Sequence, residues 1–330
     1  MHTPASDAIA ETIEPTLPII DSHHHLWMHQ NDRYLLDEFQ ADAGSGHTIV
    51  ASVYIECSVM YRCHGPQALR CVGETEFAAG IAAMSESGLF GPTRACAAIV
   101  GGADLLAGEA AADILDAMAA SGGGRLRGIR NVANWDADPS VNTGVRAYAP
   151  RDLYADPSFR AGFACLAPRG LAFDAFQYHP QLPEVCDLAD AFPDTTIVVN
   201  HCGGLLGIGP YAGSQTFDRW RSLIVEAARR PNIVMKLGGL SAKRCGFGLD
   251  SHAFPLAARE LACIWKPYIQ ACIQAFGPTR CMFESNFPPD RACGSYHTLW
   301  NALKLTVADC TAAEKADLFL HTAQRVYRIQ

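Results

Sequence analysis

The chain has 330 residues, of which 49% are hydrophobic and 18% are charged, so it can bury a large core. Its 26 basic and 34 acidic residues give a net charge of -8, which argues against binding to nucleic acid or to an anionic membrane surface. The N-terminal residues lack the basic and apolar regions of a signal peptide, and no apolar stretch reaches the roughly 18 residues of a membrane span. We therefore expect a soluble, cytoplasmic protein that binds a small molecule, with homo-oligomerisation left open.

The cysteines predict free thiols. There are 13 of them, an odd number, and no two have the C-x-x-C spacing. Most lie inside apolar or helical patterns, which is typical of small buried side chains in a reducing compartment. A disulfide framework is therefore not expected.

Eight short runs of apolar and β-branched residues predict strands. They cover residues 18–21, 48–57, 94–101, 126–132, 171–179, 195–202, 232–239 and 280–287. Helical periodicity fills most of the intervals, at 65–88, 103–124, 182–193, 215–231 and 255–277, and two further helices, at 296–305 and 311–327, close the chain. The interval 31–46, between the first two strands, has only a weak helical pattern.

Strand–helix alternation of this length predicts parallel strands with right-handed crossovers. Eight such units predict an α/β fold of the (β/α)8 TIM-barrel type. An open doubly wound sheet is the alternative, but no G-x-G-x-x-G follows the first strand. We expect one barrel domain at 18–330 after a flexible, proline-punctuated arm at 1–17.

Four histidines fall at the carboxyl ends of predicted strands, where barrels carry their chemistry. His23 and His25 follow the first strand, and a period of two points both into the barrel and His24 away from it. His179 ends the fifth strand and His201 the sixth. Imidazoles converging in this way predict a divalent metal site.

Taken in order, these motifs make the chain resemble the amidohydrolase superfamily, and within it the amidohydrolase-2 group of barrel hydrolases. The likeness spans residues 18–328 and is carried by D-S-H-H-H, GIRN, FQYHPQLP, VVNHCGG, VMKLGG and SNFP. That group includes lactonases that act on sugar lactones, pyrone dicarboxylates and muconolactone-type compounds, and also metal-dependent decarboxylases. The resemblance implies that His23, His25, His179 and His201 bind metal or polarise the substrate, with His179 also counted as catalytic.

The eighth strand departs from the family pattern. The usual S-D-x-P reads S-N-F-P here, and the amide of Asn286 has no titrating proton, so it cannot be the general base. It can still form hydrogen bonds or coordinate weakly through its oxygen. Glu284, where the family commonly has glycine, and Asp290 are the candidate replacements, although Glu284 could instead pair with Lys236. The departure also leaves metal-independent activity open.

Arginines at the mouth are candidates for binding an anionic substrate. Arg130 in GIRN matches an arginine that related lactonases use on a substrate carboxylate, and its planar fork suits that group. Arg62, after the second strand, and Tyr178 complete the expected substrate-binding set. Lys243 and Arg244 are interpreted as solvated loop residues.

The resulting hypothesis is a hydrolase that opens a small anionic lactone in aromatic-acid or sugar catabolism. Zinc, or alternatively manganese, would polarise the carbonyl and lower the pKa of water. The second hypothesis is a metal-dependent decarboxylase of an aromatic or unsaturated acid on the same barrel. The third is a barrel that has lost catalysis and only binds ligand, which the Asn286 substitution alone favours.

Overall fold

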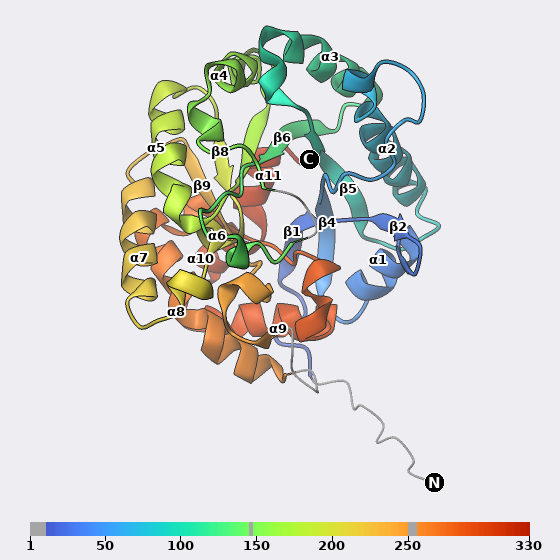
Figure 1. Cartoon of the computed structure of the whole chain (residues 1–330). Coiled ribbons are helices and arrows are strands. Elements are labelled where there is room, and N and C mark those ends of the chain that lie inside the picture. Colours follow the sequence, from blue (N-terminus) through green and yellow to red (C-terminus); the bar gives the residue numbers. More distant parts are fainter. Residues whose placement is uncertain (1–10, 145–147, 250–255) are drawn as a thin grey trace.

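The computed structural model describes residues 11–144, 148–249 and 256–330. Eight parallel strands form one sheet, hydrogen-bonded in chain order and surrounded by helices (Figure 1). The strands are β1 Pro18–His24, β4 Thr48–Ile55, β5 Arg94–Gly102, β6 Leu126–Val132, β7 Ala172–Phe176, β8 Ile197–Val199, β9 Ile233–Leu237 and β10 Cys281–Phe283. All eight predicted strands, and the (β/α)8 barrel, are thereby confirmed.

The helices alternate with the strands along the chain. They are α1 Leu36–Ala43, α2 Val72–Glu86, α3 Ala111–Ser121, α4 Pro157–Phe163, α5 Leu182–Ala191, the short α6 His201–Gly204, α7 Thr216–Ala227, α8 Ala258–Phe276, α9 Tyr296–Thr306, α10 Ala312–Ala316 and α11 Thr322–Tyr327. Within the described ranges, none of them combines the length and the apolar character needed to cross a membrane. All 13 cysteines are free, as predicted.

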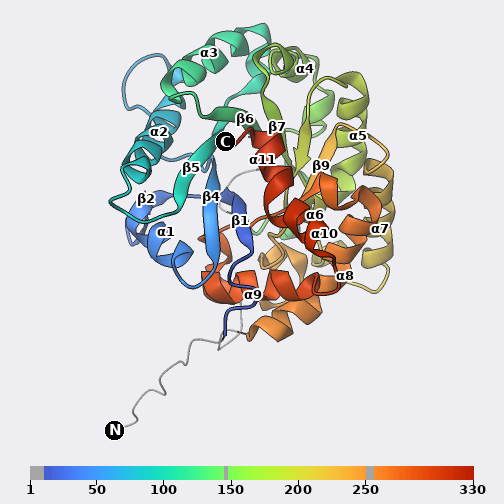
Figure 2. The same ribbon diagram turned by 180° about the vertical axis from the view of Figure 1, so that it is seen from behind.

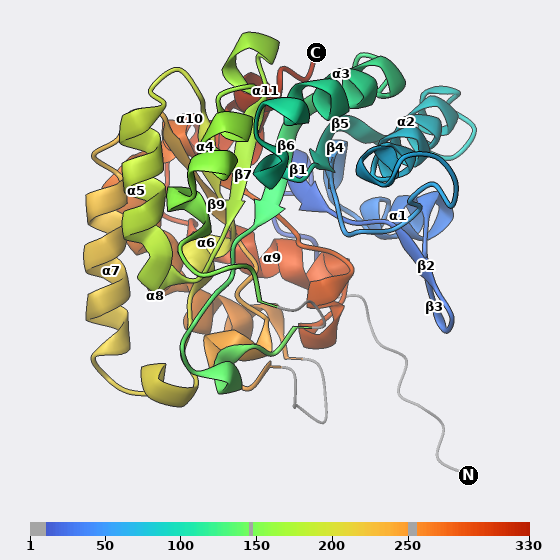
Figure 3. The same cartoon turned by 45° about the horizontal axis from the view of Figure 1, so that its top comes forward.

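The weakly helical interval after β1 forms a hairpin and then a helix. The hairpin pairs β2 Trp27–His29 with β3 Asp32–Tyr34 and stands away from the barrel (Figure 3). Helix α1 follows because Glu38 in its first turn accepts a hydrogen bond from the Leu35 backbone N–H at 2.9 Å. One local cap therefore compensates for the poor helical pattern.

Two apolar layers hold the barrel together. The first lies inside it, where Ile20, Val53, Val100 and Val198 pack together with Tyr327. The second lies between strands and helices. Helix α11 crosses the centre of the barrel in the view from behind (Figure 2), which explains why Tyr327 belongs to the inner layer.

A buried ion pair lies between the inner apolar layer and the carboxyl ends of the strands. Lys236 on β9 contacts Asp174 on β7 at 2.7 Å, and both side chains are fully buried. Asp174 also accepts hydrogen bonds from Asn200 and from the Tyr327 hydroxyl, each at 3.0 Å. The alternative pairing of Lys236 with Glu284 is wrong, because the β7 carboxylate is the one that reaches the lysine.

The expected N-terminal arm is described only in part, since residues 1–10 lie outside the described residues. Residues 11–17 contact α9. The Ile13 backbone N–H donates to Asn301 at 2.8 Å, and Lys304 donates to the carbonyls of Ile13 and Glu14 at 2.9 and 2.8 Å.

Candidate active site

A cavity of about 510 Å³ opens at the carboxyl ends of the strands. Its size falls in the usual range for pockets that hold one small ligand. The ionisable and amide side chains on its wall include His25, Arg130, Asn134, His201, Arg244 and Asn286. They come from both halves of the barrel, which places the chemistry where the fold predicts it.

A bulge in β1 sets the direction of the opening histidines. The pairing with β4 shifts register between Asp21 and His24. After this shift His23 and His25 point inward, whereas the fully buried His24 stacks on Phe39 of α1 with ring centroids 4.4 Å apart. His24 therefore packs between barrel and helix, as predicted from the strand period.

Neighbouring oxygen atoms indicate the tautomers of both inward imidazoles. Nδ1 of His25 lies 2.8 Å from the Ile55 carbonyl, and Nδ1 of His23 lies 2.9 Å from a carboxylate oxygen of Glu284. We therefore assign the proton to Nδ1 of each ring, which leaves a lone pair on Nε2. The two Nε2 atoms face each other at 3.2 Å.

This arrangement fits a divalent cation. Two lone pairs facing each other repel, and a cation between them removes the repulsion. Zinc holds imidazole nitrogens at about 2.0–2.1 Å, so two ligands of one tetrahedral ion lie about 3.3 Å apart. Burial, followed by Lys236 for His23 and by Arg130 for His25, holds the pKa of each ring well below its usual range. Both rings are thereby kept neutral, as ligands must be.

Glu284 connects the first histidine with His201. Its second carboxylate oxygen lies 2.7 Å from Nδ1 of His201 and also accepts the backbone N–H of that residue at 3.1 Å. One ligand atom each from His23, His201 and Glu284 lies within 4.8 Å of the other two. Glu284 thus orients two imidazoles at once.

Two glycines after β9 provide the space for this carboxylate. A Cβ on Gly238 would lie 2.5 Å from Cγ of Glu284, and one on Gly239 would lie 2.3 Å from Nδ1 of His201. Gly239 also has a φ of +62°, which few other residues adopt. The sequence L-G-G-L at 237–240 is therefore part of the site.

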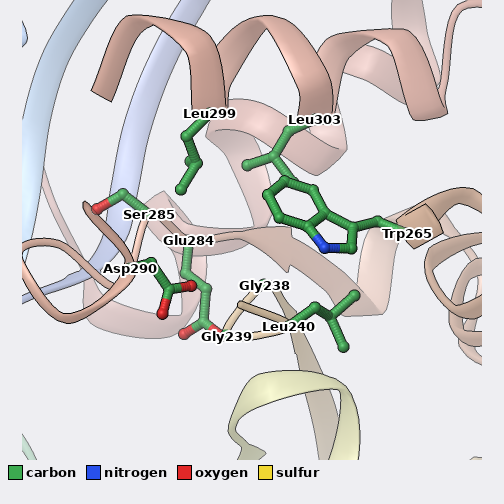
Figure 4. A pocket seen from close by; sticks show the side chains of 9 residues that line it. All are labelled: Gly238, Gly239, Leu240, Trp265, Glu284, Ser285, Asp290, Leu299 and Leu303. Atoms are coloured by element: carbon green, nitrogen blue, oxygen red, sulfur yellow. The ribbon is translucent and has the colours of Figure 1, made fainter. Parts of the chain in front are cut away.

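A small, mostly apolar space lies beside the carboxyl groups of Glu284 and Asp290, on the side away from the large cavity. Figure 4 shows both carboxyl groups beside a space lined by Leu240, Trp265 and Leu299, with a volume of about 10 Å³. Most of this lining is apolar, so little replaces the water that the two carboxyl groups lose on burial. Burial accordingly raises the pKa of Glu284 to about 7 and that of Asp290 to about 7.

Asn286 and Asp290 form a unit of their own. The Asn286 amide donates to Asp290 at 2.9 Å, and the Asn286 backbone N–H donates to the His23 carbonyl at 2.9 Å. Asn286 lines the large cavity, but Asp290 lies behind it. The structure therefore brings Asn286 and Glu284 to the histidines and leaves Asp290 one layer further out.

His179 is not part of the histidine cluster. Strand β7 ends at Phe176, three residues earlier, so His179 lies in the turn before α5. Its Nδ1 accepts the Leu206 backbone N–H at 3.1 Å, and its ring contacts Tyr211. The neighbouring Tyr178, in contrast, lines the cavity as expected.

The two arginines predicted to bind substrate lie in different places. Arg130 lines the cavity, and its Nε contacts Glu56 at 2.7 Å. Arg62 is exposed, pairs with Glu76, and does not line the cavity. Arg244, which the sequence suggested was merely solvated, lines the wall instead. Its position in the loop after the seventh strand was the only signal.

Comparison with known proteins identifies the family of this chain. The family model described as Amidohydrolase matches residues 20–329. An uncharacterized protein of Sinorhizobium fredii is 29% identical over 336 residues, covering 95% of this chain and 99% of that protein. An L-fucono-1,5-lactonase of Burkholderia multivorans is 28% identical over 323 residues, covering 94% and 96%.

A solved structure shares the architecture. An amidohydrolase of Burkholderia multivorans, crystallised with bound HEPES, is 25% identical with a TM-score of 0.73, over 94% of this chain and 99% of that one. A second crystal form of it contains bound zinc. Fold, strand-end histidines and family match agree, and the chain belongs to the amidohydrolase family of hydrolases.

Proposed function

We propose that this protein hydrolyses a small lactone with the help of a divalent ion, zinc in our proposal, held by His23 and His25. The observation that carries the proposal is the pair of neutral imidazoles whose Nε2 atoms face each other at 3.2 Å. The zinc found in the Burkholderia amidohydrolase and the lactonase activity named for a 28% identical relative support it.

When bound, such an ion acts as a Lewis acid toward the lactone carbonyl and lowers the pKa of water. The protein then has to accept one proton from the attacking water. His201 lines the cavity, and Glu284 holds its Nδ1, which leaves Nε2 as the accepting atom. The Glu284 carboxylate stabilises the imidazolium that forms, as carboxylates do beside catalytic histidines.

Ring opening completes the reaction. The water oxygen bonds to the carbonyl carbon, the bond from that carbon to the ring oxygen breaks, and His201 returns its proton to the ring oxygen. The product is an open-chain hydroxy acid. Asn286 holds substrate or water through its amide, and Asp290 fixes the orientation of that amide through the 2.9 Å hydrogen bond.

Glu284 and His201 together take the place of the single base that the family usually has on the eighth strand. Glu284 supplies the negative charge that Asn286 lacks, and it does so through the ring of His201. Asp290 does not line the large cavity, so it acts on the site only through Asn286.

A product assay tests the proposal. Protein loaded with zinc or manganese is given a panel of five- and six-membered lactones, and acid release and carbon dioxide release are followed together. We expect one acid group per lactone consumed and no carbon dioxide. Carbon dioxide from an aromatic or unsaturated acid would favour the decarboxylase, and ligand binding without turnover of any kind would favour a binding protein.

A further inference from the structure

The two arginines on the cavity wall differ in what neutralises them. Nε of Arg130 contacts Glu56 at 2.7 Å, and its Nη2 also donates to the Glu56 carbonyl. Its remaining nitrogen lies 3.4 Å from Nε2 of His23. The charge of Arg130 is therefore matched by Glu56 within the protein.

Arg244 has no such match. Among the residues that the structure describes, no carboxylate lies within ion-pair distance of its guanidinium. The one hydrogen bond that the guanidinium makes to them is a long contact of 3.4 Å to the Gly239 carbonyl. Its Nε is buried without a hydrogen-bond partner. The guanidinium lies over the ring of Phe176, 5.3 Å from the centroid.

The position of Arg244 relates it to the reacting groups. Phe176 makes an edge contact with His201, with ring centroids 4.9 Å apart, and both residues line the cavity. Arg244 therefore presents its charge to the cavity on the same side as the proposed proton acceptor. Aromatic side chains, among them Trp27, Tyr148 and Tyr178, also line the wall and suit a flat ring.

We propose that Arg244 is the residue that binds a carboxylate on the substrate, so that the preferred lactone carries an acidic group. This inference rests on the proposed function for the word lactone, but the anion site stands on the geometry alone. A planar guanidinium without a protein partner matches a carboxylate in a bidentate manner. Lys243, exposed at the rim, adds positive potential for the approach.

The first experiment measures binding without chemistry. Benzoate and benzamide have the same shape and differ in charge, and their affinities for the zinc-loaded protein are measured by titration calorimetry. We expect benzoate to bind more tightly, and Arg244→Gln to weaken benzoate binding by about 10- to 100-fold while leaving benzamide unchanged. Arg229→Gln, which removes an exposed arginine paired with Glu226, is the matched charge control and should change neither affinity.

Three results would overturn the proposal. Benzoate could bind wild-type protein no more tightly than benzamide. Arg244→Gln could keep the full preference. The preference could also disappear when the metal is removed and yet survive in Arg244→Gln, in which case the ion and not the arginine holds the carboxylate.

The second experiment uses a lactone and its counterpart in which a carboxamide replaces the ring carboxylate. In wild-type protein kcat/KM should be higher for the carboxylate, and Arg244→Gln should lower that value by about 10- to 100-fold without affecting the amide. If neither lactone is hydrolysed, the proposed function fails, and the benzoate titration still decides the anion site. If both are hydrolysed equally by both proteins, the anion site fails and the hydrolase remains.

Discussion

Two polar layers lie inside the barrel, and the upper one is nearer the cavity. They differ in whether their charged groups have partners within the protein. In the lower layer, Asp174 accepts hydrogen bonds from Lys236, Asn200 and Tyr327, and no charge lacks a partner. In the upper layer, the Nε2 atoms of His23 and His25 face each other, and Arg244 has no carboxylate among the described residues. The lower layer has the properties of a structural support, and the upper layer those of a site that awaits ligands.

The comparison shows why buried charge by itself does not identify an active site. Both layers are buried and both contain ionisable groups, yet in the lower layer Lys236 and Asp174 already neutralise each other. Variants of the lower layer should therefore reduce stability, and variants of the upper layer should reduce metal binding or activity in a folded protein.

The largest expected effect concerns the buried ion pair. Lys236→Met leaves Asp174 charged and without its cation, and removing one partner of such a pair lowers the free energy of unfolding by about 3–5 kcal/mol. Urea unfolding of metal-free protein measures it. The double variant Lys236→Met/Asp174→Asn should recover part of the loss, and a single variant as stable as wild type would refute the supporting role of the pair.

Next in size is the change at Glu284. Glu284→Gln keeps the shape but removes the charge that holds Nδ1 of His23 and His201, so the affinity for zinc should fall by about 10- to 100-fold. Competition with a chromophoric chelator measures this affinity. Asp290→Asn is the matched control, because Asp290 contacts neither histidine and should leave the zinc affinity unchanged; an equal loss in both variants would argue against Glu284 as the orienting group.

A smaller effect is expected at the base of the lower layer. Tyr327→Phe removes one hydroxyl from Asp174, which keeps its bonds to Lys236 and Asn200, so the free energy of unfolding should fall by about 1 kcal/mol. Turnover measured at a temperature well below the unfolding transition should stay at the wild-type value. A large loss of turnover with little change in stability would show that the two layers are not separate.

The smallest effect is expected at Arg62. Arg62→Gln breaks an exposed ion pair with Glu76, and pairs of this kind contribute little to stability. Because Arg62 does not line the cavity, kcat/KM should not change. A tenfold fall in kcat/KM would instead support the prediction from the sequence that this arginine binds substrate.

The parts of the fold that depend on local pattern could be predicted from the sequence. Each strand is a short apolar run, and the alternation with helices determines the barrel. The inward direction of His23 and His25 was also predicted, although the bulge in β1 that brings it about leaves no signal in a single sequence.

The contacts between distant segments could not be predicted in the same way. His179 was expected beside the other histidines because the fifth strand was taken to extend to residue 179, but β7 ends at Phe176. Glu284 could be named as a candidate, yet its position between His23 and His201 requires β10 to lie against the glycines after β9. Arg244 depends on a loop whose conformation is set by packing.

In the proposed reaction, His23 and His25 hold a metal that turnover needs. The most direct measurement is the metal content of untagged protein by plasma mass spectrometry, together with lactone turnover, in wild type and in His23→Ala/His25→Ala. We predict about one equivalent of zinc in wild type, and loss of both metal and turnover in a variant whose circular dichroism is unchanged. Full turnover in wild-type protein that contains no stoichiometric metal would contradict the account.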